Sequence, residues 1–287
     1  MSVSSRQLFT KIHQQLQQIY PSEEARNIAF LLLEHCFDIS RTAVLASKDI
    51  PDTNTDQINP LIERLLKHEP VQYVLGETLF YGRWFEVNSN VLIPRPETEE
   101  LVYRIVEDFS FRKKDPLAIL DIGTGSGCIA VTLAAEFPVA QVWAIDVSEK
   151  ALQVAQANAR LNSVQVNFVQ ADILDQQRIG LPENLQLDLM VSNPPYVTRA
   201  EMELMRQNVT AYEPHLALFV EGEDALLFYR HIASLGKSVL KTGGACYMET
   251  NENYTKQVQD LFEEYGYTAT QLITDMFGKD RFVKAIL

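Results

Sequence analysis

The sequence predicts an α/β fold preceded by a smaller helical domain, and three observations lead to this prediction. Short apolar runs that are typical of buried strands alternate with helical patterns from residue 117 onward. The first of these runs enters a glycine-rich turn over residues 123–127, of the kind that joins a strand to a helix. Residues 4–68, by contrast, show helical spacing throughout.

The N-terminal region is expected to be a helical domain over residues 1–69. Apolar residues recur on one helical face from Leu8 to Ile19, and Ser22 opens a second helix after a proline. The stretches 40–46 and 55–68 have the pattern of two further helices.

Residues 70–93 are expected to form a linker that contains a β-hairpin. The segments Thr78–Tyr81 and Trp84–Val87 are rich in aromatic and β-branched residues, and Gly82-Arg83 lies between them. The hairpin would join the helical domain to the remaining domain, residues 94–287.

The elements of residues 94–287 follow from apolar runs, helical spacing and capping residues such as Ser148. Strands are expected over residues 117–122, 141–146, 164–169, 187–192 and 244–250, and helices over residues 96–109, 128–135, 149–161, 223–240 and 253–265. The stretches 269–274 and 281–286 are expected to close the sheet as an antiparallel pair.

The charge balance weighs against a nucleic-acid substrate. The formal net charge is −13, whereas proteins that bind nucleic acids normally carry a basic stripe. The one basic run, Arg112-Lys113-Lys114, reads as a solvated loop between a helix and the first core strand.

Cysteine usage and hydropathy indicate a cytoplasmic protein without a metal or a membrane span. Cys36, Cys128 and Cys246 are isolated and lack metal-type spacing, so we expect them to be reduced and buried. The longest apolar run, Ile28–Leu33, is far shorter than the roughly 20 residues that cross a bilayer. The first residues lack the apolar segment of a secretory signal.

The most informative motif is Asn-Pro-Pro-Tyr at residues 193–196, which ends the apolar run 187–192. The two prolines remove two N–H donors and fix φ, and a residue before proline is held extended. The resulting corner offers an amide, bare carbonyls and an aromatic face, which suit an uncharged planar –NH2 group. A Pro-rich turn without function is the alternative for an isolated motif, but the position late in an α/β pattern favours the functional interpretation.

The glycine turn has the spacing G-x-G-x-G and follows an acid, Asp121. A dinucleotide fingerprint requires glycine or alanine at the third place, where Cys128 stands here. A carboxylate at residue 121 would repel a pyrophosphate but can accept from the ammonium of an amino-acid-like ligand. The alternative is that Asp121 caps its own turn, which is compatible with the first interpretation.

Two further acids follow strands at the expected ligand edge. Asp146 ends a strand about 20 residues after the glycines, where a ribose-binding carboxylate is expected. Asp172 can accept from an adenine amino group and Ile173 can cover the ring, although a plain loop is the alternative. In this order the motifs predict an S-adenosylmethionine site followed by a pocket for an amino-group acceptor.

Over nearly its whole length the chain resembles the release factor glutamine methyltransferase family. The resemblance is carried by Leu-Ile-Pro-Arg-Pro-Glu-Thr-Glu at 92–99, by residues 121–127 and 192–196, by Tyr-Glu-Pro at 212–214 with Ala217-Leu218, and by Asp280-Arg281. The Asn-Pro-Pro-Tyr motif is shared with adenine-N6 and RNA guanine-N2 methyltransferases. The first segment combined with Tyr-Glu-Pro is more specific to this family.

The resemblance implies a Rossmann-like class I S-adenosylmethionine-dependent methyltransferase sheet with a small N-terminal helical domain joined by the hairpin. It implies methylation of the side-chain nitrogen (N5) of the glutamine in the Gly-Gly-Gln motif of peptide-chain release factors. The enzyme is expected to be a cytoplasmic monomer whose helical domain recognises the release factor, and the alternative is that this domain is a purely stabilising cap. It places the cofactor on Gly123, Thr124, Gly125, Ser126, Gly127, Asp146, Asp172, Ile173 and Asn193, and the acceptor glutamine on Asn193, Pro194, Pro195 and Tyr196.

The chain departs from the family pattern at three places. Ile173 stands where relatives often have an aromatic residue, Ala225 replaces a frequent glycine, and residues 250–254 lack the common Ile-Gly and a later Gln. None of these departures touches the acceptor corner.

The expected mechanism assigns catalytic roles to Asn193, Pro194 and Tyr196. The Asn193 side-chain oxygen and the Pro194 carbonyl would each accept one N–H of the substrate amide, and Tyr196 would pack against its plane, without a dedicated general base. One alternative is an N-methyltransferase that acts on an exocyclic amino group of a DNA or RNA base. The other is a non-catalytic nucleotide-binding module.

Overall fold

The computed structural model describes residues 2–176, 179–202, 205, 207–220 and 222–287, and the chain divides into two compact units. One unit comprises residues 2–76 together with α10 (Gln207–Tyr212). The other unit begins at Glu77, so the hairpin belongs to it. Each unit has its own core.

The N-terminal unit is mainly helical, as expected. Its helices are α1 (Ser5–Leu16), α2 (Ser22–Phe37), α3 (Arg41–Leu45), α4 (Asn59–Leu65) and α5 (Val71–Leu75), with a 3-10 helix at Asp52–Ile58. Leu8, Ile12 and Leu16 on one face of α1 are buried in its core. The structure adds a small antiparallel pair that the helical spacing did not indicate, β1 (Ser2–Ser4) with β2 (Asp49–Pro51).

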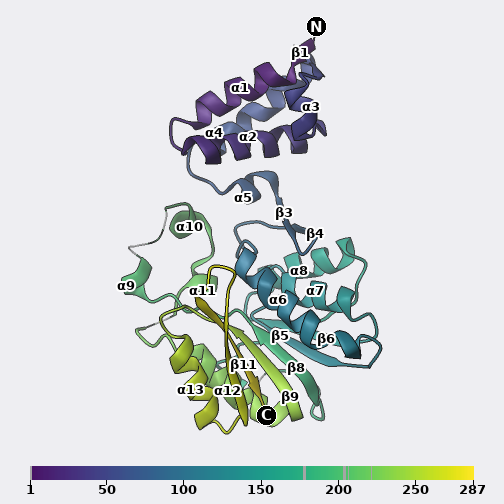
Figure 1. Ribbon diagram of the computed structural model, residues 1–287, viewed down its shortest axis with the longest axis vertical. Helices are drawn as coiled ribbons and strands as arrows, with labels where there is room; N and C mark the ends of the chain where they lie inside the picture. Colours follow the sequence, from purple (N-terminus) through teal and green to yellow (C-terminus); the bar gives the residue numbers. More distant parts are fainter. Residues whose placement is uncertain (1, 177–178, 203–204, 206, 221) are drawn as a thin grey trace. The chain divides into compact units, whose positions relative to one another are not determined.

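The second unit is built on one mostly parallel sheet, which confirms the expected α/β fold (Figure 1). In the described part of the chain, seven strands lie in the order β10-β11-β9-β8-β5-β6-β7. Their bounds are β5 (Ala118–Ile122), β6 (Gln141–Asp146), β7 (Asn167–Gln170), β8 (Leu187–Ser192), β9 (Leu240–Glu249), β10 (Ala269–Thr274) and β11 (Asp280–Ile286). The strands from β9 to β7 pair in parallel, and β11 and β10 close the sheet as the expected antiparallel pair.

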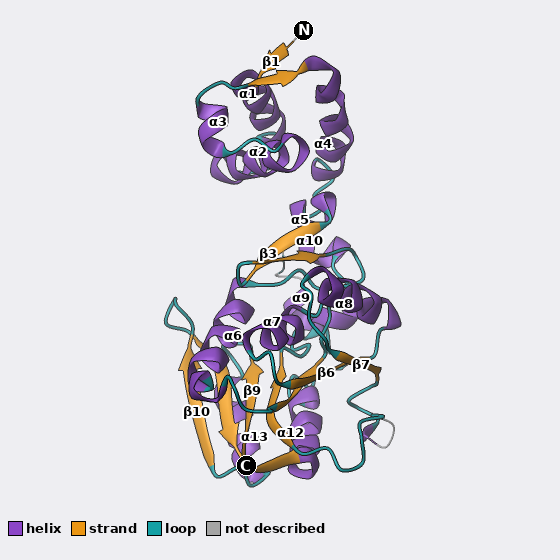
Figure 2. Cartoon of the chain, turned by 90° about the vertical axis from the view of Figure 1, so that its right-hand side faces the viewer, coloured by secondary structure: helices purple, strands orange, loops and turns teal. Residues whose placement is uncertain are grey.

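Helices cover both faces of this sheet (Figure 1, Figure 2). They are α6 (Pro96–Asp108), α7 (Cys128–Glu136), α8 (Glu149–Leu161), α12 (Leu227–Val239) and α13 (Thr255–Glu264), with short turns at α9 (Arg199–Met202), α11 (His215–Leu218) and Ser110–Arg112. Side chains of a strand alternate between faces. Ile119 therefore packs with α6 and α7, whereas the next residue, Leu120, packs with α12 and α13.

The hairpin is formed by β3 (Glu77–Phe80) and β4 (Arg83–Glu86), and its turn lies one residue earlier than predicted. Tyr81 and Gly82 both have positive φ, of 50° and 70°. Such a two-residue turn matches the right-handed twist of the strands, so Arg83 pairs with Phe80 instead of turning.

Three element starts in the second unit differ from the prediction by three or four residues. The strand predicted from residue 244 is β9, which begins at Leu240. The predicted strand 164–169 is observed at 167–170. The helix predicted from residue 223 begins at Leu227, because the Asp224 side chain accepts from the Leu226 N–H and forms a turn before it.

Candidate active site

The predicted site residues meet at one edge of the sheet, where the parallel strands end. Ile122 of β5 lies opposite Ile145 of β6 and opposite Ser192 of β8, and Ser192 lies opposite Met248 of β9. The segments that follow these strands therefore lie next to one another. Ligands of open α/β sheets bind at this edge.

The glycine turn leaves open space on its first part and packs closely on its last part. Gly123, Gly125 and Gly127 have positive φ of 71°, 55° and 80°, which glycine adopts without steric cost. A Cβ added to Gly123 or Gly125 would meet no atom within 4 Å, whereas one on Gly127 would lie 3.0 Å from the Ala155 Cβ. The first two glycines thus have open space beside their backbone, and the third allows α8 to pack closely.

Asp146 holds the glycine turn and still offers acceptor sites. One oxygen accepts from the Gly125 N–H at 2.8 Å, and the other accepts from the Ser148 N–H at 2.9 Å. Burial raises the pKa of Asp146, while these backbone donors oppose the shift. Because each carboxylate oxygen has two lone pairs, both can also accept from ligand hydroxyls.

The Asp121 side chain is fully buried, and only one of its two carboxylate oxygens has hydrogen-bond partners among the described residues. Its Oδ2 accepts from the Thr124 hydroxyl at 2.6 Å and from the Ala130 N–H at 3.2 Å, so it caps its own turn. Its Oδ1 is buried and has no hydrogen-bond partner among the described residues. Burial raises the pKa of Asp121 to about 7, and the charge of Asp146 acts in the same direction. An unpartnered buried oxygen is costly, and a donor on a ligand would satisfy it.

The Asn-Pro-Pro-Tyr corner is tied to the glycine turn and to α6. The Ser192 hydroxyl donates to the Ile122 carbonyl at 2.6 Å. The Asn193 Nδ2 donates to the Thr98 hydroxyl at 3.0 Å. Pro194 is buried, and the half-buried Tyr196 packs against the α12–α13 face, where burial raises its pKa.

The Thr98 hydroxyl in turn donates to Glu249, the last residue of β9, at 2.6 Å. Thr98 and Glu249 are 3% and 2% exposed. Burial raises the pKa of Glu249 to about 7, the Thr98 hydrogen bond opposes this shift, and nearby Glu97 adds to it. Neither residue was singled out from the sequence, although Thr98 lies within the family-like segment 92–99.

Arg95 and Glu213 join two segments of the family pattern. The buried Glu213 accepts from the Arg95 guanidinium at 2.5 Å and from the Ile93 N–H at 3.2 Å. The segment 92–99 and the Tyr-Glu-Pro segment are therefore in direct contact. This pair was not predicted from the sequence, although both residues lie in segments that carry the family resemblance.

Asp172 and Ile173 follow β7 at the same edge. The exposed Asp172 accepts from the Leu174 N–H at 2.9 Å, and Ile173 is 7% exposed within the α12–α13 core. Gln170, two residues before Asp172, lies opposite Asp146. Their adenine-binding role stays a prediction.

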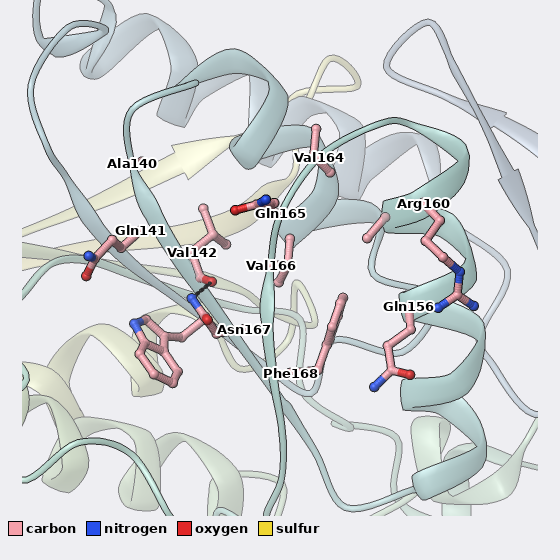
Figure 3. Close-up of a pocket in the computed structure, with 12 residues that line it drawn as sticks. Ala140, Gln141, Val142, Gln156, Arg160, Val164, Gln165, Val166, Asn167 and Phe168 are labelled. Carbon is pink, nitrogen blue, oxygen red and sulfur yellow. Dashed lines mark hydrogen bonds between the residues drawn. The ribbon is translucent and has the colours of Figure 1, made fainter.

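A cavity of about 720 Å³ lies elsewhere, at the opposite end of β6 from Asp146 (Figure 3). Figure 3 shows side chains of β6, β7 and α8 around it, including Asn167, whose Nδ2 donates to the Val142 carbonyl at 3.1 Å. It is lined by residues 140–143, 156, 159, 160 and 164–168. None of the predicted site residues lies among them.

Within the described ranges, no three His, Cys, Asp or Glu side chains are grouped to hold a metal ion. None of the helices described is both long and apolar enough to cross a membrane.

Known protein families match both parts of the chain. The PrmC N-terminal domain model matches residues 7–76, and the Methyltransferase small domain model matches residues 105–232. Two solved structures have a TM-score of 0.52 to this chain: a methyltransferase from Pyrococcus furiosus (18% identical, 78% of this chain and 96% of that chain) and a T. thermophilus 16S rRNA N2 methyltransferase in complex with AdoMet and guanosine (17% identical, 73% and 49%). At this identity they show the fold alone.

Curated relatives extend over almost the whole chain. The release factor glutamine methyltransferase of Flavobacterium psychrophilum is 44% identical over 96% of both chains. That of Bacteroides thetaiotaomicron is 42% identical over 96% of this chain and 97% of its own, and that of Bacillus subtilis is 37% identical over 93% and 94%. The chain belongs to the release factor glutamine methyltransferase family.

Proposed function

We propose that this chain transfers a methyl group from S-adenosyl-L-methionine to the side-chain nitrogen (N5) of the glutamine in the Gly-Gly-Gln motif of peptide-chain release factors. One observation carries the chemistry. Asn193 donates its Nδ2 to Thr98, so its side-chain oxygen is the atom it presents as an acceptor, beside a proline-fixed backbone. The Asn193 side-chain oxygen and the Pro194 backbone carbonyl would be two acceptors, one for each N–H of a carboxamide.

The residues at the strand ends fit the cofactor. The unpartnered Asp121 oxygen suits its ammonium group, and the open backbone at Gly123 and Gly125 permits close approach. Asp146 would accept from the ribose hydroxyls, and Asp172 with Ile173 would bind the adenine. The bound cofactor supplies an electrophilic methyl group on a sulfonium.

The role of the acceptor corner is to aim a weak nucleophile. A carboxamide nitrogen is a poor nucleophile because its lone pair is delocalised into the carbonyl. Acceptance of its two N–H groups by the Asn193 oxygen and the Pro194 carbonyl would polarise it and orient it for in-line displacement, while Tyr196 packs against the amide plane. Positioning of this kind can supply several kcal/mol, about 7 or more in favourable cases. The nitrogen loses its proton after methylation, so no general base is assigned.

The substrate is a folded protein, and we assign its recognition to the helical domain. In this proposal residues 1–69 contact the release factor, residues 70–93 link the domains, and residues 94–287 carry the methyltransferase site. The enzyme would act as a cytoplasmic monomer without direct contact to nucleic acid.

The test is to incubate the protein with labelled S-adenosylmethionine and a purified release factor, and to map the label by mass spectrometry. The expected result is one methyl group on the glutamine of the Gly-Gly-Gln motif, and none on a release factor whose glutamine is replaced by alanine. Label on added tRNA or DNA would instead support the base methyltransferase. Cofactor binding without transfer to protein or nucleic acid would support the non-catalytic module.

A further inference from the structure

We infer that Thr98 and Glu249 are positioning residues for methyl transfer, which fix the orientation of the Asn193 amide through a hydrogen-bond relay. The inference rests on the proposed function and names what keeps its acceptor group in place. The relay runs from Asn193 Nδ2 to Thr98 Oγ1 at 3.0 Å and from Thr98 Oγ1 to Glu249 Oε2 at 2.6 Å.

Three separate elements build the relay. Asn193 follows β8, Thr98 lies in the first turn of α6, and Glu249 ends β9, the strand that pairs with β8. The Thr98 hydroxyl donates to Glu249 and accepts from Asn193, and neither partner lies in α6. The Thr98 hydroxyl therefore links α6 to the segments that end β8 and β9.

The Glu249 carboxylate determines which group donates in each hydrogen bond of the relay. A carboxylate only accepts hydrogen bonds, and a hydroxyl has a single proton. Thr98 donates that proton to Glu249, so its oxygen has only lone pairs left for Asn193. The Asn193 amide must therefore turn its NH2 group toward Thr98 and its oxygen away from it.

This direction matters because an asparagine amide is nearly symmetric in shape. A rotation by half a turn exchanges Oδ1 with Nδ2 and would present N–H donors to the substrate NH2 group, which can itself only donate. The acceptor would be lost, although the fold and the cofactor site would be unchanged. The relay would select the productive orientation before the substrate binds.

The burial of Glu249 is consistent with this role. It is 2% exposed, and its carboxylate is costly at this position, because burial raises its pKa to about 7. The Tyr229 hydroxyl donates to its backbone carbonyl at 3.0 Å and further fixes the residue. An assay at pH 8 keeps the carboxylate ionised.

The decisive variants are Thr98→Val, which keeps the side-chain shape without the hydroxyl, Thr98→Ser, which keeps the hydroxyl, and Glu249→Gln, whose amide can either accept or donate. Thr132→Val is the matched control, because Thr132 is also fully buried in this unit and its hydroxyl has no partner among the described residues. The readouts are kcat and KM for methylation of the release factor, the Kd of S-adenosylmethionine and the melting temperature.

For Thr98→Val and Glu249→Gln we expect kcat to fall by about 10-fold to 100-fold, as for a misaligned reacting group, with the cofactor Kd within about 2-fold of wild type. Thr98→Ser should recover kcat to within about 3-fold, and Thr132→Val should keep wild-type kinetics.

Normal kcat in both Thr98→Val and Glu249→Gln would overturn the positioning role. A parallel loss of kcat, cofactor affinity and melting temperature would also overturn it, because it indicates a structural role. Failure of Thr98→Ser to recover activity would overturn it for the same reason. Absence of transfer by the wild type would overturn the proposed function together with the relay, whereas an active wild type beside fully active variants would overturn the relay alone.

Discussion

The two carboxylate oxygens of Asp121 have different surroundings. One oxygen holds the glycine turn and the other is buried without a partner in the described chain. Burial raises its pKa to about 7, so without a cofactor the folded protein binds this proton more tightly than the unfolded protein does. The proton therefore stabilises the fold below about pH 4, the ordinary carboxyl pKa, and this stabilisation is lost as the pH rises through about 7.

This linkage predicts the pH dependence of Asp121→Asn. Measured without cofactor, the free energy of unfolding of the wild type should fall relative to that of the variant by about 2 kcal/mol between pH 5 and pH 7, since one pKa unit corresponds to about 1.4 kcal/mol. Denaturant unfolding at several pH values gives this difference. The pKa of Glu249 is also raised to about 7, but Glu249 is present in both proteins, so its contribution to the pH dependence cancels in the difference between them. If the unfolding free energies of the two proteins change in parallel with pH, the pKa of Asp121 is not raised as described.

At the residue scale, local sequence predicted where Asp146 and Asn193 lie, because Asp146 ends a short apolar strand, Asn193 follows one, and the carboxyl ends of parallel strands meet at one edge of the sheet. The Thr98–Glu249 hydrogen bond could not be predicted from local sequence, because it joins residues 151 positions apart. It depends on the fact that β9 lies beside β8, and this order is a property of the sheet and not of either segment.

Among the elements, α8 connects the hairpin with the glycine turn through Asn158. The Asn158 side chain is fully buried, accepts from the Glu86 N–H at 2.6 Å, and donates to the Glu86 and Ser126 carbonyls at 2.9 and 2.8 Å. Asn158 therefore ties α8 both to the end of β4 and to the glycine turn.

We expect Asn158→Ala to lower the free energy of unfolding by about 2–4 kcal/mol, because it leaves buried backbone groups unpaired, and to weaken cofactor binding through the glycine turn. The control is Asn162→Ala, at the residue that follows the C-terminal end of α8, where a half-buried side chain donates to the carbonyls of Trp84 and Asn158. Its cost should stay near or below about 1 kcal/mol. Chemical denaturation and cofactor titration measure both effects, and equal losses for the two variants would contradict a special role of Asn158.

Element boundaries followed the sequence closely where the signals were local. The Ser148 hydroxyl accepts from the Ala151 N–H at 3.2 Å, and α8 has the predicted bounds, as does β8. The hairpin turn was displaced because strand twist, which is a property of the pair, selects positive φ at Tyr81 and Gly82. The β1–β2 pair was missed because three-residue strands carry too little periodicity.

For the whole molecule, the two compact units have separate cores, and the core of the helical unit is made of residues between Leu8 and Val74. The chemistry assigned above is confined to the second unit. A helical unit that recognises the release factor would contribute binding energy remote from the reacting amide.

Whole release factor should therefore be methylated far more efficiently than a short peptide that contains its Gly-Gly-Gln loop. We expect kcat/KM to be at least about 100-fold lower for the peptide, because it lacks the remote contacts and must be ordered on binding. Steady-state kinetics with both substrates test this, with a peptide that lacks the glutamine as the blank. Comparable kcat/KM values would assign recognition to the acceptor corner alone.

The most direct test of the account is a single-turnover measurement of methyl transfer by Asn193→Ala, with cofactor saturating, and with Asn253→Ala as an exposed asparagine control in the same unit. The account predicts a loss of about 100-fold or more in the transfer rate, with the cofactor Kd changed little, since one of two acceptors for the amide is removed. The control should transfer at the wild-type rate. A transfer rate near that of the wild type in Asn193→Ala would contradict the claim that this side chain holds and aims the substrate nitrogen.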